Sequence, residues 1–249
     1  MEPDCSIDPQ RLSNFLDTLS PLNQEIVKKI VAHTLYIRRD EMIAMVLRCI
    51  YRLHSITSLY NLYIPSGKIG SEHWLLLEIE SHLSPFEVFT KETLKDLSNP
   101  YPIVIIDDAI YSSAHMCGII DEDIRYSHPW IKNKVYCVVA ITSSLRVQCT
   151  MGPYFNAEII ADKSLDHLQL KSLFHSLPDD YMYSYFGCET GCVLPVYFSH
   201  KIANEFGSYS FYHQIVKEKP RRNEINKITW KNMKDLIDRL RKKRDVHQM

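Results

Sequence analysis

Midway along the chain the sequence reads Tyr101-Pro-Ile-Val-Ile-Ile-Asp-Asp-Ala-Ile-Tyr-Ser-Ser-Ala-His-Met116. Its first half is too continuously apolar for an amphipathic helix and follows a turn-forming Asn-Pro pair, which is typical of a strand buried in a parallel sheet. The predicted strand, 103–107, ends on two adjacent carboxylates, Asp107 and Asp108. A short polar turn follows, and a helix is predicted to begin near Ala114.

The position of this acid pair indicates a ligand site. In open α/β sheets ligands bind at the carboxyl ends of the strands, and a helix N-terminus at that edge attracts anions. Two carboxylates beside an anion-binding turn suit a ligand that carries both sugar hydroxyls and a phosphate. The alternative is structural, with carboxylates that only cap the next helix.

Strands and helices alternate on both sides of this stretch. Strands are predicted at 58–64, 86–90, 135–141 and 157–161, and helices at 71–83, 92–97 and 165–177. This alternation predicts an α/β protein with a parallel sheet and helices on both faces.

The two ends of the chain differ from this core. Asp8-Pro9 and Ser20-Pro21 each supply a helix cap followed by proline at the first helical position, and a third helix is predicted over 40–53. From about Asp179 aromatic residues crowd together and the alternation fails, which we interpret as a hood or flap over 179–225. A basic helix is predicted at 229–244. The expected organisation is a helical lead-in (1–54), an α/β core (55–178) and a C-terminal part with the hood and the basic helix (179–249).

Composition narrows the class of protein. The chain has 249 residues, a formal net charge of −1, 45% hydrophobic and 24% charged residues. These values are ordinary for a soluble globular protein and give no general attraction to nucleic acid or anionic membranes. No apolar run is long enough to cross a membrane, and the N-terminus lacks the features of a signal peptide. Seven cysteines, an odd number, do not indicate a disulfide framework, so a reducing, cytoplasmic location is predicted.

The stretch around the acid pair resembles the signature of type I phosphoribosyltransferases. In that family an apolar strand runs into two acidic residues and then, after two or three spacers, into Thr-Gly-x-Thr. Asp107 and Asp108 match the acids and Ser112 matches the first Thr. The resemblance implies that both acids hold the ribose hydroxyls of phosphoribosyl pyrophosphate (PRPP), directly or through Mg²⁺. It also implies that the following turn binds the 5-phosphate, through Ser112, Ser113, Ala114, His115 and Met116.

A second loop supports the same resemblance. Pro65-Ser-Gly-Lys-Ile-Gly-Ser71 lies between the first predicted strand and its helix. It lacks the upstream glycine and the hydroxyl residue after lysine that a Walker A loop requires. In the family the corresponding loop holds pyrophosphate through backbone amides and a basic side chain, a role that falls here on Ser66, Gly67, Lys68 and Gly70. Alone, such a turn carries no function; the resemblance covers roughly residues 55–165.

The acceptor is not indicated by these motifs, because the family binds it under a variable hood. The run Leu194-Pro-Val-Tyr-Phe-Ser-His-Lys-Ile-Ala203 is faintly similar to a Tyr-Phe-x-His-Lys element of phosphoribosyltransferase-like proteins. Tyr197 and Phe198 would stack on a nucleobase and Lys201 would reach an exocyclic oxygen. Ordinary core packing of the two aromatic residues is the alternative.

The resemblance therefore implies an enzyme of nucleotide metabolism that transfers a 5-phosphoribosyl group from PRPP to a nucleobase-like acceptor, with Mg²⁺, and releases pyrophosphate. A non-catalytic module that binds a nucleotide or phosphorylated sugar is the main alternative. It is favoured by Ser113, which stands where the family has Gly, and by His115, which stands where it has the second Thr. A structural or interaction protein is a third possibility. The basic helix is more typical of a solvated face than of a nucleic-acid contact, and whether the chain forms a homodimer stays open.

Overall fold

A computed structural model describes residues 7–66, 69–110, 114–143, 156–165, 196–198, 212–217 and 228–247. The chain divides into two compact units, Met1–Arg39 with Asp166–Arg222, and Asp40–Leu165 with Asn223–Met249. These bounds differ from the expected division at 54 and 178. The third N-terminal helix and the C-terminal helix both belong to the unit that contains the sheet.

The first unit is built from capped helices and a small sheet. α1 (Pro9–Asp17) begins after Asp8, whose carboxylate accepts from the N–H groups of Gln10 and Arg11 at 3.0 and 3.1 Å. α2 (Pro21–His33) begins after Ser20 in the same way, so both predicted caps are confirmed. β1 (Leu35–Ile37) pairs in parallel with β7 (Val196–Phe198), and α9 (Tyr212–Ile215) lies next to the start of α1 through a 2.8 Å bond from Asp8 N–H to Ile215 O. The sequence patterns predicted neither β1 nor α9.

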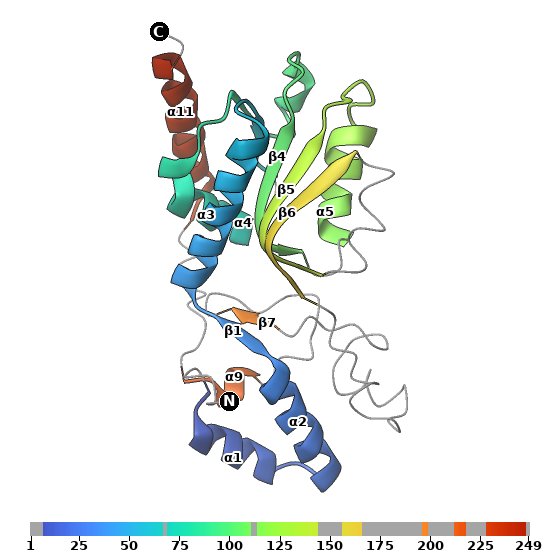
Figure 1. Ribbon diagram of the computed structural model, residues 1–249, viewed down its shortest axis with the longest axis vertical. Helices are drawn as coiled ribbons and strands as arrows, with labels where there is room; N and C mark the ends of the chain where they lie inside the picture. Colours follow the sequence, from blue (N-terminus) through green and yellow to red (C-terminus); the bar gives the residue numbers. More distant parts are fainter. Residues whose placement is uncertain are drawn as a thin grey trace. The chain divides into compact units, whose positions relative to one another are not determined.

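The second unit contains a five-stranded sheet in which every pair is parallel. Its strands are β2 (Asn61–Tyr63), β3 (Glu87–Phe89), β4 (Ile103–Ile110), β5 (Val135–Ser143) and β6 (Ala157–Leu165), in the order β3-β2-β4-β5-β6 (Figure 1). The predicted α/β class and parallel sheet are confirmed. β4 lies at the centre, and all eight of its residues are buried, as its apolar run predicted.

Helices cover both faces of this sheet. α3 (Arg39–Ile56) and α4 (Ser71–Ile79, continued by η1, Glu80–His82) lie on one side, and α5 (Ala114–Gly118) lies on the other (Figure 1). Right-handed connections explain this, because the chain leaves β2 in one direction along the sheet and leaves β4 in the other. α5 continues into η3 (Ile119–Tyr126), which is π-helical. A short 3₁₀ turn, η2 (Leu94–Asp96), precedes β4.

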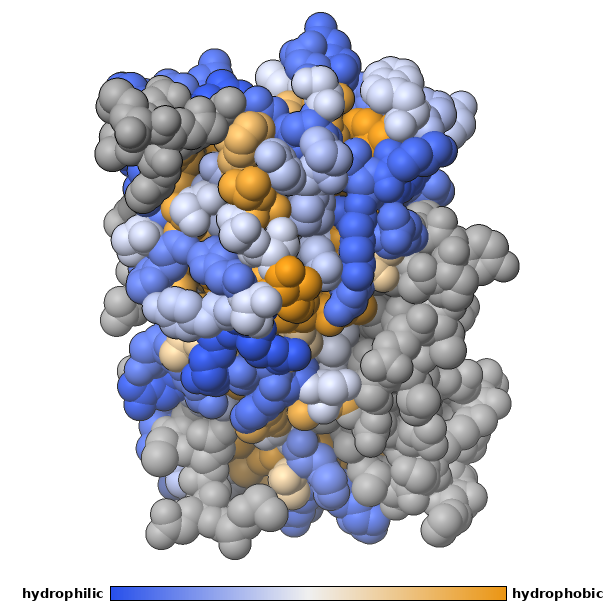
Figure 2. All heavy atoms as spheres, turned by 45° about the horizontal axis from the view of Figure 1, so that its top comes forward, coloured by the Kyte–Doolittle hydropathy of each residue, from blue (hydrophilic) through white to orange (hydrophobic). Residues whose placement is uncertain are grey.

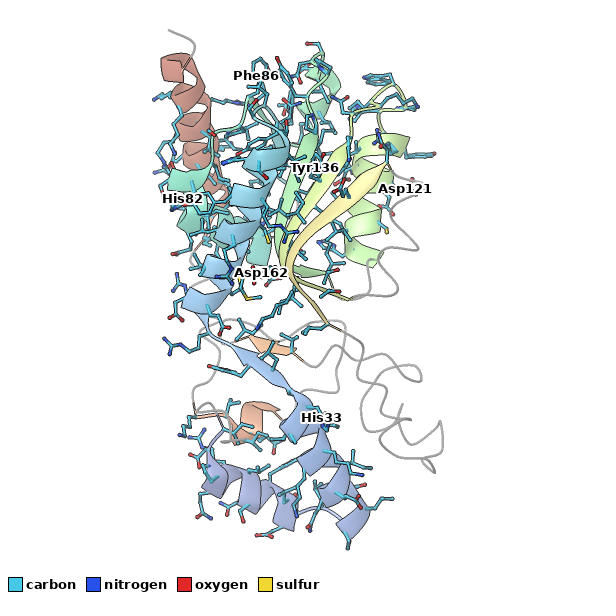
Figure 3. The ribbon with its side chains drawn as sticks, viewed as in Figure 1. His33, His82, Phe86, Asp121, Tyr136 and Asp162 are labelled. Atoms are coloured by element: carbon cyan, nitrogen blue, oxygen red, sulfur yellow. The ribbon has the colours of Figure 1, made fainter. Side chains whose placement is uncertain are left out.

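The two helical layers are attached in different ways. α5 and η3 pack apolar side chains on the sheet, and the shared cluster includes Met116, Ile119, Ile120, Ile124, Tyr63, Ile103, Ile105, Val135, Cys137 and Val139. α3 adds polar contacts. Arg48 donates two hydrogen bonds of 2.8 Å to Asp162 of β6, a residue labelled in Figure 3, and the Cys49 thiol donates to Val139 O.

The C-terminal helix, α11 (Trp230–His247), is part of the sheet unit. Its predicted apolar stripe is buried, with Met233, Leu236 and Leu240 fully enclosed and Ile237 7% exposed. Three of its cations form contacts within the chain. Arg239 donates two bonds to the Glu80 carboxylate, Arg241 donates to Val88 O, and Lys243 donates to Glu80 O. These contacts assign an intramolecular role to part of the positive charge that the sequence placed on this helix.

Two expected segments fall largely outside the described residues. The helix predicted over 165–177 is one of them; its first residue, Leu165, ends β6. The aromatic segment 179–225 is described only at β7 and at 212–217.

Within the described ranges, no helix has the length and apolar character needed to span a membrane. Figure 2 shows one face of the molecule, on which hydrophilic residues predominate and hydrophobic ones form small groups.

Candidate functional site

The acid pair lies inside a strand, which corrects the expectation that β4 ends at Asp107. β4 continues to Ile110 because Ala109 and Ile110 pair with Ile141 and Thr142 of β5. Asp107 is 7% exposed and Asp108 is fully buried. The Asp107 carboxylate accepts a 2.8 Å hydrogen bond from the backbone N–H of Asp108.

The acids nevertheless lie at the point where the direction of chain connection reverses. If the five strands of this sheet, β2 to β6, are numbered 1 to 5 in chain order, their spatial order is 2-1-3-4-5. The switch point of such a sheet lies between its first and third strands, which here are β2 and β4. Leu62 pairs with Val104, so Tyr63, the last residue of β2, is level with Ile105. β4 therefore extends five residues beyond β2, and Asp107 lies in that extension. In open α/β sheets this is where ligands bind.

Strand alternation separates the two carboxylates. Adjacent residues of a strand point to opposite faces, and the pairing of β4 with β5 keeps one register from Ile103 to Ile110. Asp107 therefore shares the face of Ile103 and Ile105, which α5 and η3 cover. Burial, with smaller contributions from Cys117 and Asp107, raises the pKa of the Cys137 thiol on this same face. Asp108 points to the α3 and α4 side.

This separation limits how a metal could be held. Carboxylates on opposite faces of one strand cannot chelate a single ion together. Over the described parts of the chain, no group of three or more His, Cys, Asp or Glu side chains is arranged to hold a metal. A Mg²⁺ ion usually keeps several waters and is bound through one or two carboxylates and substrate phosphates. Asp107 could supply the one carboxylate in such a site, where the Mg²⁺ ion enters already bound to the phosphates of the substrate.

The 5-phosphate turn is only partly described. Ser112 and Ser113 lie outside the described residues. Ala114, His115 and Met116 form the first turn of α5; His115 is exposed, whereas Met116 is 2% exposed and packs in the core cluster. The Met116 side chain therefore belongs to the core, which leaves its backbone for the predicted contact with the 5-phosphate.

The loop after β2 lies at the same switch point, because β2 ends at Tyr63 beside β4. Gly67 and Lys68 are outside the described residues. Hydrogen bonds from the Thr90 hydroxyl, from the backbone N–H of Glu92 and from the Ser66 side chain lower the pKa of the Glu92 carboxyl. Ser66 is therefore connected to the turn that follows β3.

One residue of this loop region was missed by sequence reasoning. His73, 1% exposed, accepts a 3.0 Å hydrogen bond at Nδ1 from Gly70 N–H, and its Nε2 lies 3.0 Å from Pro65 O. A carbonyl only accepts, so Nε2 carries the proton and donates to Pro65. The available signal was spacing: Gly70 caps α4, and the third helical residue can bond back to the cap N–H.

Two more side chains enclose His73. Trp230 of α11 contacts the imidazole edge to face, with ring centroids 5.4 Å apart. The Glu72 carboxylate lies 2.9 Å from Nδ1 and directly over Gly70, where a Cβ atom would overlap it. One Nδ1 cannot accept from Gly70 and also donate to Glu72, so the observed Gly70 bond requires an unprotonated Nδ1.

A further polar network joins the same edge of the sheet. The Tyr63 hydroxyl at the end of β2 donates to Asp123 of η3 at 2.9 Å, and Lys91 after β3 pairs with the other Asp123 oxygen at 2.7 Å. Burial, together with the Asp123 and Glu92 carboxylates, raises the pKa of Tyr63, so its hydroxyl stays a donor. This network fixes the position of β2's last residue relative to η3.

The residues assigned to the acceptor lie in the other unit. Tyr197 and Phe198 belong to β7, where they pair with Tyr36 and Ile37 of β1. Lys201 lies outside the described residues.

A cavity of about 320 Å³ occurs away from the acid pair. It lies along β3 and is lined by residues 86–89 and by Thr93, Asp96 and Arg241. None of the predicted site residues lines it, so volume alone does not identify the switch point as the site.

No protein-family model matches the chain, and a search of curated proteins finds no similar sequence.

Proposed function

We propose that the chain is a phosphoribosyltransferase-like enzyme that transfers a 5-phosphoribosyl group from PRPP to a nucleobase-like acceptor and releases pyrophosphate. The observation that supports it best is the register of β2 with β4. It gives Asp107 and the loop after β2 a common location at the switch point of a parallel sheet. A phosphoribosyltransferase type of fold, a hood from 179–225 and a cytoplasmic location belong to the same proposal.

The described residues suit different parts of this reaction. Phosphoribosyl transfer passes through an oxocarbenium-like sugar, so the protein has to hold the ribose, stabilise the leaving pyrophosphate and exclude water. Asp107 would accept hydrogen bonds from the ribose hydroxyls, since a carboxylate accepts several bonds at once. Asp108, buried on the other face, would position this strand segment. Mg²⁺ bound to pyrophosphate would neutralise its charge.

The remaining roles fall on the two loops. The turn over Ser112–Met116 would take the 5-phosphate, with Met116 contributing only its backbone. Lys68 and the backbone amides of the loop after β2 would take the pyrophosphate. Gly70 is the exception among those amides, because its N–H already donates to His73. The assignment of Tyr197, Phe198 and Lys201 to the acceptor rests on the resemblance, because these residues belong to the other unit.

A second function has one specific observation in its favour. Two of the groups assigned to pyrophosphate already have partners in the protein, Gly70 N–H with His73 and the Ser66 side chain with Glu92. A non-catalytic module that binds a nucleotide or phosphorylated sugar needs no pyrophosphate contacts. This alternative keeps Asp107 as the ribose contact and removes the chemical step.

A pyrophosphate-release assay separates the two functions. The protein is incubated with PRPP, Mg²⁺ and each of a panel of nucleobases, alongside Asp107→Asn and the control Asp96→Asn, which removes an exposed acid of the same unit. We expect release with at least one base and a loss of about 10- to 100-fold in kcat/KM for Asp107→Asn, the effect of removing a charged hydrogen-bond acceptor. Nucleoside monophosphate binding without turnover would support the non-catalytic module. Release that Asp107→Asn leaves unchanged would contradict the role of Asp107, whereas a wild type that neither releases pyrophosphate nor binds a nucleoside monophosphate would contradict both functions.

A further inference from the structure

The imidazole of His73 joins two backbone groups that are five residues apart. Its Nδ1 accepts from Gly70 N–H and its Nε2–H donates to Pro65 O, each at 3.0 Å. Pro65 and Gly70 stand at the two ends of the loop to which the proposed function assigns pyrophosphate. A single side chain therefore fixes where this loop begins and where it ends.

The ring itself has little freedom to move. It is 1% exposed, it extends from the first turn of α4, and Trp230 packs against it edge to face. Both of its nitrogens have backbone partners, and a buried imidazole that rotated would leave those partners unsatisfied. The bridge is thus a rigid attachment between the helix and the loop ends.

We propose that His73 is a positioning residue for pyrophosphate, holding Pro65 and Gly70 at the separation that the bound ligand requires. This inference rests on the proposed function, and it adds a residue that contacts the loop and never the ligand. Binding to a flexible loop carries the free-energy cost of ordering it, and a loop whose ends are already fixed avoids part of that cost. Loss of either hydrogen bond would therefore weaken ligand binding.

Two conservative variants remove the hydrogen bonds one at a time. His73→Asn keeps an acceptor near the position of Nδ1 and loses the donor to Pro65. His73→Gln keeps a donor near the position of Nε2 and loses the acceptor for Gly70. The control is His82→Asn, which changes an exposed histidine of the same unit (Figure 3).

The experiment is a calorimetric titration of each full-length protein with inorganic pyrophosphate and Mg²⁺, with the thermal midpoint measured alongside. We expect each His73 variant to bind about three- to tenfold more weakly while it remains folded at the titration temperature, the range for one lost neutral hydrogen bond. His82→Asn should bind as the wild type does. A purely structural His73 would lower the thermal midpoint and leave the affinity of the folded fraction unchanged, which would overturn the proposal.

Hydrogen exchange on the wild type tests the same bridge without any variant. Gly70 N–H should already be protected without ligand and should stay equally protected when magnesium pyrophosphate binds. Rapid exchange that slows only on binding would overturn the inference, even if both variants failed to fold. A wild type that binds no magnesium pyrophosphate would refute the proposed function and this inference together, whereas normal binding by both variants would refute the inference alone.

Discussion

Substitution of Gly70 by alanine tests the packing around the loop after β2. An ideal Cβ at Gly70 would lie 2.6 Å from Glu72 Oε1 and closer still to Oε2, both well inside van der Waals contact. The backbone at Gly70 is extended, with φ −121° and ψ −167°, so alanine meets little backbone strain there. The main steric cost in the folded protein should therefore come from displacing the Glu72 carboxylate.

The size of this effect follows from opposing contributions. Alanine restricts the unfolded chain, which stabilises by about 0.4–1 kcal/mol, but it is a poorer helix cap than glycine by a similar amount. Overpacking in a closed site costs about 1–3 kcal/mol. The Glu72 side chain is 12% exposed and flexible at its end, so the lower half of that range applies. We expect Gly70→Ala to lower the free energy of unfolding by about 1–2 kcal/mol.

A double-mutant cycle isolates the overlap. In a Glu72→Ala background the carboxylate is absent, and Gly70→Ala should then cost close to nothing. Urea unfolding followed by tryptophan fluorescence is suitable, because the chain's three tryptophans, Trp74, Trp130 and Trp230, all lie in the sheet unit. Equal costs in both backgrounds, to within about 0.5 kcal/mol, would refute the reasoning.

Two further predictions concern ionisable groups. Hydrogen bonds from Arg239 hold the pKa of Glu80 below its usual 4.5, so the pair stabilises the fold above that pH and the stabilisation is lost as the pH falls through the folded-state pKa. Glu80→Gln should therefore lower the free energy of unfolding by about 0.5–1 kcal/mol at pH 7 and by progressively less below pH 4.5; a difference that does not change with pH would contradict the assignment. Burial raises the pKa of Cys49 to about 11 and that of Cys137 further, so iodoacetamide at pH 8 should label neither thiol until the protein is unfolded. Peptide mass spectrometry would show this, and rapid labelling of the native protein at either site would count against it.

The sequence was most informative where structure depends on local pattern. The buried run of β4, the caps of α1 and α2 and the apolar stripe of α11 all follow from residue type and spacing. The parallel pairing follows less directly, from alternation of strands with helices, and the strand order did not follow from the sequence.

The rest depends on partners far away in the chain. β4 extends past the acid pair because β5 offers residues to pair with, and no local signal at Asp107 reports that. β1 and β7 are three residues each and pair across more than 150 positions. The charge of α11 predicted a basic surface, but Glu80 and the carbonyl groups of Glu80 and Val88 take three of its cations.

In the candidate site, too, some features could be predicted from the sequence and others depended on the fold. The composition of the two loops and the acid pair could be read from the sequence, together with their order along the chain. The orientation of Asp107 and Asp108 to opposite faces required the register of β4. The role of His73 required the fold of the loop around it, although the Gly70-to-His73 spacing was visible.

The most direct test of the central claim is a calorimetric titration of PRPP with Mg²⁺ into the wild type, Asp107→Asn and Asp108→Asn. We expect a single binding site in the wild type and an affinity about tenfold or more lower in Asp107→Asn, since a negative charge is lost. Asp108→Asn should act mainly through stability, because Asp108 is fully buried on the other face. No binding of PRPP by the wild type would contradict the proposed function, and equal binding by Asp107→Asn would contradict the role of Asp107.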